Sequence, residues 1–551
     1  MRRRPGNPHA PMKMKTRTLV SAFAMCLLGY CLAAAPRPPS SESPATGPIA
    51  IESGLITGIY ADEKEDIRVF KGIPYAAPPV GQLRWKPPRP AQPWQGARAC
   101  DRFAPACPQP DSLTGQSVGR QDEDCLYLNV WTPAEGAEAK RPAMVWIHGG
   151  GCTTGAGSMP LYDGGNFARQ GVVLVTINYR LGPLGFLAHP LLSKESENDV
   201  SGNYGFLDQI AALQWVQRNI AAFGGDPDCV TIFGESAGSA SVARLMVSPL
   251  ARGLFHRAIA QSGGARGNNC HLRQASHGLE PMEKLGQRIA EKLGCAQARD
   301  PLGALRSKTP EEILAASEPA QGLFGKGNKF GWVVDGWALP DDPAALFDQG
   351  RQWPVAFLAG FNADEWTIFQ RNLPVKGALG YSWMVRGVFG DSAPQALELF
   401  PVEGNDVQAA LNRLVTLMAF GEPARAMARA MEKAGAPAYL YYFTRVTAAG
   451  RALGLGAFHG QEIPFVFGTL PPRRSYSGED RDLSRIMQAY WVNFAKTGNP
   501  NGPGLPEWPA HAKATDACLE LGNGNQSPHR LVPGALRLPG ALRRPRDGTR
   551  P

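Results

Sequence analysis

The stretch that decides the fold is Val230–Ser239, VTIFGESAGS, which reads as a strand that ends abruptly in a sharp turn. Its first four residues favour strands, and two glycines then flank Ser236 at the spacing of the G-x-S-x-G motif. In such a strand-to-helix turn the serine hydroxyl is pushed out above the sheet. The backbone N–H of Ala237 then lies at a helix N-terminus, where developing negative charge is favoured. The stretch therefore predicts a serine nucleophile, the other interpretation being an ordinary turn.

A second motif supplies hydrogen-bond donors for an oxyanion. Ala143–Gly151 (AMVWIHGGG) is an apolar strand that runs into His148 and three glycines. A loop of this type offers backbone N–H groups, and glycine lets a substrate carbonyl approach the main chain closely. Phosphate binding is the minor interpretation, because no Lys-Ser/Thr pair follows and no G-x-G-x-x-G opens a helix.

A serine nucleophile needs a base, which we expect to follow it in the chain. His459 lies in Gly456–Phe467 (GAFHGQEIPFVF), a glycine-flanked loop suited to a histidine that moves protons. His256 is interpreted as a structural residue of a helix. The sequence thus favours His459 as the base.

The acid that orients this base is expected at the end of another strand. Residues Trp353–Gly360 form an apolar strand pattern that leads into Phe361–Trp366 (FNADEW). Asp364 and Glu365 both stand at the carboxyl end of this strand, where sites of α/β proteins are built. Spacing alone does not choose between them.

The ordered motifs together resemble the type-B carboxylesterase family, the α/β-hydrolases related to cholinesterases, from about Ile49 to Pro509. Besides the serine turn and the His459 loop, the resemblance rests on FKGIPYAAPPVG at 70–81, EDCLYLNV at 123–130, NYRLG at 178–182, GFLDQ at 205–209 and FGGDP at 223–227. It implies an α/β-hydrolase fold, with a large, mixed, mostly parallel sheet flanked by helices and long active-site loops.

The resemblance also implies site residues. It implies Glu365 as the acid, beside Ser236 and His459 as the other catalytic residues. Around them it implies an oxyanion hole of three backbone amides and a hydrogen-bonding serine behind the catalytic residues. Glu235, next to the nucleophile in the chain, is expected to add a negative charge near the pocket. The amides are those of Gly150, Gly151 and Ala237, and the serine is Ser262. Two structural ion pairs are implied as well, Arg84–Glu123 and Arg180–Asp208.

The chain has ten cysteines, two of them near its amino end. The resemblance implies two disulfides, Cys107–Cys125 and Cys270–Cys295. The remaining four are interpreted as free thiols, and they are Cys100, Cys152, Cys229 and Cys518. No C-x-x-C or H-x-x-x-H pair points to a metal, and no nicotinamide or flavin motif is present, so no cofactor is expected.

The chain is expected to form one large domain with short additions at its ends. Basic residues precede an apolar run and Ala33–Ala35, so residues 1–35 are predicted to be a signal peptide, with lipid anchoring at Cys31 disfavoured by the bulky Tyr30. Residues 36–48 are a Pro/Ser-rich linker, 49–535 the single α/β domain and 536–551 a basic tail. No stable membrane span is expected in the mature chain.

The formal net charge of +9 belongs to the two ends of the chain. Six basic residues lie in 1–17, and the segment from Ala541 adds a net +3, so the body is near neutral. A basic nucleic-acid-binding face is therefore not expected. No oligomeric state is predicted.

These patterns predict a secreted or periplasmic serine carboxylesterase that hydrolyses small-molecule esters through an acyl-enzyme. Three alternatives remain: an esterase for polycarboxylate esters such as the tricarballylic side chains of fumonisin toxins, a lipase, and a catalytically inactive binding protein. The loop Pro108–Asp124 contains no aromatic residue for holding a choline cation. Cys152 and Trp366 stand where the family often has an aromatic residue and a glycine, which predicts a rebuilt pocket wall.

Overall fold

The computed structural model describes residues 45–61, 66–112, 115, 117–133, 136–267, 269–276, 278–321, 325–372, 375–471, 475–522 and 528–530. The predicted signal peptide, most of the linker and the basic tail lie outside these residues. Within the part of the chain that is described, no helix is long and apolar enough to cross a membrane.

An eleven-stranded mixed sheet forms the centre of the molecule, in the order β16-β15-β14-β13-β10-β9-β7-β8-β6-β4-β3. The strands from β8 to β15 pair in parallel, and antiparallel strands complete both edges. Their bounds are β3 Ile59–Tyr60, β4 Ile67–Pro74, β6 Tyr127–Pro133, β7 Arg141–Ile147, β8 Val173–Ile177, β9 Gly225–Glu235, β10 Arg257–Gln261, β13 Ala356–Asn362, β14 Ala438–Phe443, β15 Ala517–Leu521 and β16 Pro528–Arg530. The predicted mixed, mostly parallel sheet is confirmed.

Two small sheets lie outside the main one. They are β1-β2-β5 (Ile49–Ile51, Gly54–Thr57, Ala97–Ala99) and β11-β12 (Cys270–His271, Val333–Val334).

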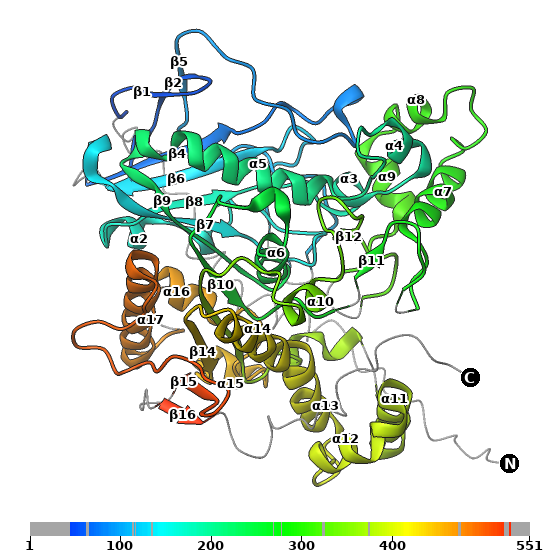
Figure 1. Ribbon diagram of the computed structural model, residues 1–551, viewed down its shortest axis with the longest axis vertical. Coiled ribbons are helices and arrows are strands. Elements are labelled where there is room, and N and C mark those ends of the chain that lie inside the picture. The colour runs from blue at the N-terminus through cyan, green and yellow to red at the C-terminus, as the bar shows by residue number, and fades with distance from the viewer. Residues whose placement is uncertain are drawn as a thin grey trace, which may run out of the picture.

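Helices connect the parallel strands, as parallel pairing requires. They are α2 Gly165–Arg169, α3 Gly182–Phe186, α4 Pro190–Glu195, α5 Tyr204–Asn219, α6 Ala237–Leu245, α7 Met282–Lys292, α8 Pro301–Arg306, α9 Pro310–Ser317, α10 Pro343–Asp348, α11 Gly377–Phe389, α12 Ala393–Leu399, α13 Val407–Val415, α14 Glu422–Lys433, α15 Ala448–Ala452, α16 Ile463–Phe467 and α17 Gly478–Thr497. Figure 1 shows α11, α12 and α13 gathered together, away from α5.

The sheet is buried on both faces, because alternate residues of a strand point to opposite sides. In β7, Val145 packs into the larger core cluster, which includes residues of α5, α6 and α14. The next residue, Trp146, packs into the second cluster, with residues of α2, α16 and α17. Two layers of helices thus enclose the sheet and hold its strand ends fixed.

One local prediction is corrected. His256 is not in a helix: it precedes β10, and its ring accepts a hydrogen bond from Val230 N at 3.2 Å.

The predicted ion pairs are both present. Arg180 Nε and Nη2 donate to Asp208 at 2.8 and 2.7 Å, and both side chains are almost fully buried. Arg84 pairs with Glu123 through two donors in the same way.

Candidate active site

The nucleophile candidate stands between a strand and a helix, as the sequence predicts. β9 ends at Glu235 and α6 begins at Ala237, so Ser236 alone forms the turn, with φ of 56°. A side chain at this φ is strained, which is common at functional sites. The neighbouring glycine is required by space, because a Cβ on Gly238 would lie 1.9 Å from the carbonyl oxygen of Ile147. This strained turn places a half-buried serine at the carboxyl edge of the sheet, where it lines the cavity.

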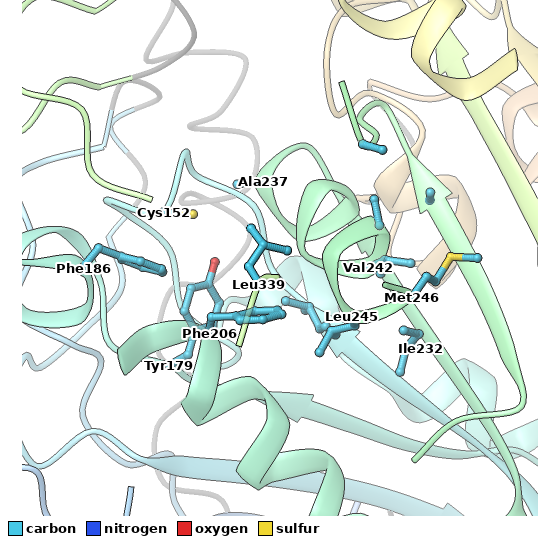
Figure 2. Packing of buried hydrophobic residues seen from close by; sticks show 14 of the residues in the cluster. Cys152, Tyr179, Phe186, Phe206, Ile232, Ala237, Val242, Leu245, Met246 and Leu339 are labelled. Atoms are coloured by element: carbon cyan, nitrogen blue, oxygen red, sulfur yellow. The ribbon is translucent and has the colours of Figure 1, made fainter. Parts of the chain in front are cut away.

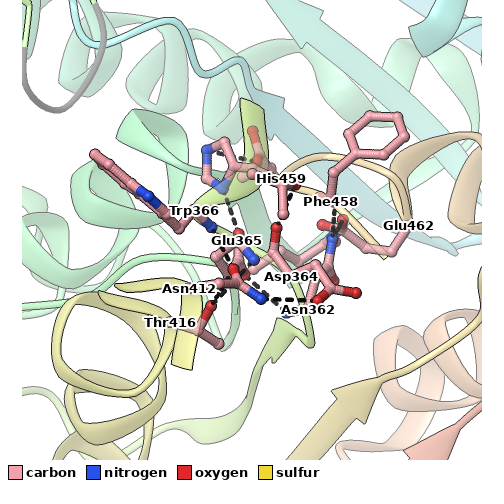
Figure 3. Close-up of polar contacts among 12 residues, drawn as sticks. Asn362, Asp364, Glu365, Trp366, Asn412, Thr416, Phe458, His459 and Glu462 are labelled. Carbon is pink, nitrogen blue, oxygen red and sulfur yellow. Dashed lines mark hydrogen bonds and ion pairs between the residues drawn. The ribbon is translucent and has the colours of Figure 1, made fainter. Parts of the chain in front are cut away.

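The base and the acid candidates meet at this edge (Figure 3). Nδ1 of His459 lies 2.5 Å from Oε2 of Glu365, and Glu365 is fully buried. The other carboxylate oxygen accepts from Asn362 N at 2.7 Å. Of the two acids that spacing left open, Glu365 is thus the one that contacts the histidine.

Asp364 has a different partner set. Its carboxylate accepts from Ala457 N at 2.7 Å and from Asn412 Nδ2 at 2.8 Å. Its own backbone also pairs with the segment before His459, because Asp364 N donates to Ala457 O at 3.0 Å. Asp364 therefore links the His459 loop to the end of β13 through these hydrogen bonds.

A π-helical turn at Thr416–Gly421 supports the acid from the other side. Thr416 Oγ1 accepts from Glu365 N at 3.1 Å. Phe420, in the same turn, packs its ring 5.1 Å from the His459 ring, and Phe369 packs at 5.2 Å. Such turns are frequent at functional sites, and here the turn fixes both the acid and the histidine ring.

Glu235 contacts His459 from the opposite side. Its Oε1 lies 3.1 Å from His459 Nε2, without hydrogen-bond alignment. Burial raises the pKa of Glu235 to about 8, although the charge of His459 lowers it. Burial lowers the pKa of His459, but the charges of Glu235 and Glu365 outweigh this effect and raise it to about 9. The predicted negative charge beside the nucleophile is therefore partly neutralised by protonation near pH 7.

The three residues predicted to supply oxyanion amides line one cavity. Gly150, Gly151 and Ala237 line it together with Ser236 and His459. Gly150 has φ of 96°, and a Cβ there would lie 2.1 Å from the carbonyl oxygen of Thr154. The three residues predicted to form the oxyanion hole therefore lie in the wall of the same cavity as the serine.

His148, which follows β7 and precedes these glycines, is held by Tyr179, just after β8. Tyr179 donates to His148 O at 2.9 Å, and its ring stacks on the His148 ring at 4.5 Å. Burial lowers the pKa of His148 to about 4, so its ring is neutral. This keeps the glycine loop in place without adding charge.

The prediction for Ser262 is wrong in its hydrogen bond. Ser262 is fully buried and lines the cavity, but its hydroxyl has no hydrogen-bond partner among the described residues. Its backbone is held at φ of 51° by a hydrogen bond from its N–H to Gly360 O.

The prediction of a rebuilt pocket wall is not supported at either position. Neither Cys152 nor Trp366 is among the described residues that line the cavity. Cys152 is buried among core side chains near Tyr179 (Figure 2), and burial raises the pKa of its thiol to about 12. Trp366 is fully buried, with no solvent-accessible surface.

Neither predicted disulfide is present, because all eight described cysteines are free thiols. Cys107 and Cys125 are in contact: their mutual hydrogen bond, ahead of burial, raises the pKa of Cys125. Cys270 and Cys295 have different neighbours. Burial raises the pKa of both thiols, but the charges near them differ. Lys329 and Arg244 lie near Cys270, and Lys308 and Glu312 lie near Cys295. The four other thiols, interpreted as free, are also free here.

One buried acid near the site, Glu462, was not predicted from the sequence. Glu462 accepts from Asn362 Nδ2 at 2.6 Å and from Gln261 Nε2 at 3.1 Å, beneath the His459 loop. Burial, and then the charge of Glu365, raises its pKa. Its position three residues after His459 was the available signal. Among the described residues, no group of three or more His, Cys, Asp or Glu side chains could hold a metal ion.

The cavity that joins these groups has a volume of about 2090 Å³. It is large enough for a small molecule, since ligand pockets measure roughly 300–1,000 Å³. Ser112 and Val118 of the 108–124 loop lie on its wall. A buried acid, a histidine and a serine in the wall of one cavity, beside a glycine loop, are the groups that acyl transfer needs.

Comparisons with known proteins agree with this chemistry. The profile of the carboxylesterase family matches residues 46–381 and 401–535. The fumonisin B1 esterase of Sphingopyxis macrogoltabida is 40% identical over 472 residues, which is 83% of each chain. Carboxylesterase 1C of Rattus norvegicus is 36% identical over 527 residues, 89% of this chain and 92% of its own.

Solved structures give the same result. A PNB esterase superposes with a TM-score of 0.75 at 34% identity, covering 88% of this chain and 96% of its own. A carboxylesterase of Geobacillus stearothermophilus superposes with a TM-score of 0.74 at 35% identity, covering 88% and 97%. The chain therefore belongs to the carboxylesterase family, with the α/β-hydrolase fold, and is a carboxylic ester hydrolase.

Proposed function

We propose that the protein is a serine carboxylesterase whose catalytic residues are Ser236, His459 and Glu365. The contact between His459 Nδ1 and Glu365 Oε2 at 2.5 Å carries this proposal, because it leaves Nε2 to accept the proton of Ser236, which lines the same cavity as His459. Ser236 Oγ attacks the ester carbonyl and gives its proton to His459. The negatively charged Glu365 stabilises the resulting imidazolium.

The amides of Gly150, Gly151 and Ala237 are proposed to hold the oxyanion. Preorganised backbone donors of this kind cost no rearrangement during the reaction. His459 then protonates the leaving alcohol, which produces an acyl-enzyme on Ser236. Water, activated by the same histidine, attacks the acyl carbon and releases the acid.

A fluorophosphonate probe tests this proposal directly. Peptide mapping after incubation should find one adduct, on Ser236. The Ser236→Ala variant should take up no probe and lose at least ~10³-fold in kcat/KM, with the same thermal unfolding as the wild type. An adduct on another serine, or an active Ser236→Ala variant, would overturn the assignment.

Export from the cytoplasm is also proposed, on the basic residues, apolar run and small-residue segment of 1–35. In an oxidising compartment the adjacent thiols of Cys107 and Cys125 would pair.

A polycarboxylate ester is the second candidate for the substrate. The fumonisin B1 esterase is one of the relatives with the highest identity given above. Arg244, a buried arginine in the cavity wall, favours the same substrate class.

A further inference from the structure

The cavity wall contains a buried arginine on the helix that follows the nucleophile. Arg244 lies eight residues after Ser236 in α6, and both residues line the cavity together with Ala240. Residues four apart lie on the same face of a helix, so this face of α6 leads from the serine to the arginine. The Arg244 residue is only 3% exposed.

The contacts of this guanidinium are all with neutral groups. Nη1 donates to Ala240 O at 2.9 Å and to Gly264 O at 3.3 Å, and Nη2 donates to Asn269 Oδ1. The guanidinium lies 4.1 Å from the centre of the Trp332 ring. Its Nε–H is buried and has no acceptor.

No carboxylate among the described residues forms an ion pair with Arg244. The nearest link to a negative charge passes through Asn269, whose Nδ2 donates to Asp342 Oδ2 at 2.7 Å. The other oxygen of Asp342 caps α10, accepting from Ala344 N and Ala345 N at 2.9 and 3.1 Å. Burial lowers the pKa of Arg244 to about 10, although Cys152 and Asp342 raise it, so it remains a cation at neutral pH.

A buried cation without a paired anion is costly, and proteins normally pair such charges. Here the uncompensated charge lies in the wall of the cavity that holds the reacting serine. Other charged residues line the cavity too. Asp341, Asp342 and Asp348 are acidic, Arg266 lies 3.9 Å from Asp348, and Lys329 is exposed. Arg244 differs from the other two cations because it is buried and has no ion pair among the described residues. An anionic group of the substrate would supply the missing partner.

The geometry indicates which part of the ester carries that anion. The alcohol must leave on the side of His459, because that histidine protonates it. None of the Arg244 contacts comes from the His459 loop, so the acyl group is the part that reaches Arg244. The guanidinium folds back along the helix and donates to Ala240 O. Ala240 is four residues after Ser236, so the guanidinium lies roughly one helical turn, about 5–6 Å, along the axis from the serine. A short carbon chain spans this distance.

Resting on the proposed serine mechanism, we propose that Arg244 forms a carboxylate subsite for the acyl group. The substrates of this enzyme are then esters of short di- or tricarboxylic acids, with one free carboxylate bound by the guanidinium. Arg244 acts through binding of the substrate and takes no part in proton transfer.

Two nitrophenyl esters test the proposal: the mono-ester of glutaric acid, and its methyl-capped neutral counterpart. The wild type should hydrolyse the anionic ester with kcat/KM at least about tenfold higher, as expected for a charge-assisted hydrogen bond. Arg244→Met should lower this anionic-to-neutral ratio at least about tenfold. The control Arg252→Met, which removes an exposed arginine that does not line the cavity, should leave the ratio unchanged.

A wild-type preference for the neutral ester, or an equal loss on both esters in Arg244→Met, would overturn the subsite. If Arg244→Met does not fold, inhibition of the wild type by tricarballylate is compared with inhibition by the neutral trimethyl ester. Tricarballylate should inhibit more strongly, and equal inhibition overturns the proposal. Failure of the serine mechanism is separate: an active Ser236→Ala variant would show it, whatever the anionic-to-neutral ratio.

Discussion

Glu235 and Glu365 hold the His459 ring between two carboxyl groups, one at each ring nitrogen. Oε1 of Glu235 lies 3.1 Å from Nε2, and Oε2 of Glu365 lies 2.5 Å from Nδ1. The nitrogen that must receive the serine proton is therefore also the one next to Glu235. The two carboxyl groups raise the pKa of the base that they surround.

This arrangement predicts a shifted pH profile. Because the pKa of His459 is raised to about 9, the neutral base is lost as pH falls through that range, and kcat/KM should fall with it. Glu235→Gln removes one negative charge and should move the rising limb to lower pH by about one unit. Profiles from about pH 5 to 10 measure this, with the exposed Glu398→Gln as control. If the rising limb of the pH profile does not move in Glu235→Gln, Glu235 does not set the pKa of His459.

The two neighbouring acids of FNADEW should respond differently to the loss of charge. Glu365→Gln keeps its shape but cannot stabilise the imidazolium, so kcat should drop at least about 10²-fold. Asp364→Asn keeps one acceptor for Ala457 N and should lose less than about tenfold. Single-turnover kinetics on both variants give the comparison, with thermal unfolding to confirm folding. The reverse order would assign the acid to Asp364.

The sequence predicted the parts of this site that depend on short motifs. The G-x-S-x-G turn and the glycine run each need a particular backbone shape, which glycine spacing reveals. Spacing could not separate Asp364 from Glu365, because both stand at the end of β13. Only the resemblance chose Glu365, and the contact with His459 agrees with it.

The supporting residues were harder to foresee because they come from distant segments. Thr416 reaches Glu365 through a π-helical turn that no periodicity indicates, and Arg244 is an ordinary charged residue of a helix until its surroundings are known. Ser262 shows the opposite error. Its position was implied by resemblance, but its hydroxyl has no partner here. Tertiary packing, which sequence patterns do not encode locally, decides these cases.

Stability should depend strongly on the Arg180–Asp208 pair. Asp208→Asn would leave a buried guanidinium without its counter-ion, and unfolding in urea should show a loss of about 3–5 kcal/mol. The exposed pair Arg218–Glu52 is the control, and Glu52→Gln should cost no more than about 1 kcal/mol. Similar losses in both variants would mean that burial of the first pair has no special weight.

The first cysteine pair should form a disulfide when the protein is exported. Cys107 and Cys125 are already in contact, and the bond would close a loop worth about 3 kcal/mol in the chain-entropy model. Peptide mapping of unreduced exported protein should find this pair, with Cys270 and Cys295 still reduced. Free thiols at Cys107 and Cys125 in that material would argue against the pairing or against export.

Choline esters should gain nothing over neutral esters of the same size. The 108–124 loop has no aromatic residue to face a quaternary ammonium group. Trp332, which lines the cavity, already has the Arg244 guanidinium over its ring at 4.1 Å. A second cation there would meet an existing positive charge.

Beside the nucleophile, the group that could attract a cation is Glu235, and burial weakens this attraction by raising the pKa of the carboxyl to about 8. At pH 7 we therefore expect kcat/KM for a choline ester and for its uncharged isostere to agree within a few fold. Raising the pH to about 9 ionises Glu235 and should improve the choline ester relative to the isostere, an increase that Glu235→Gln should abolish. A choline advantage above about tenfold at pH 7, some 1.4 kcal/mol of transition-state binding, would reveal a cation site elsewhere in the cavity.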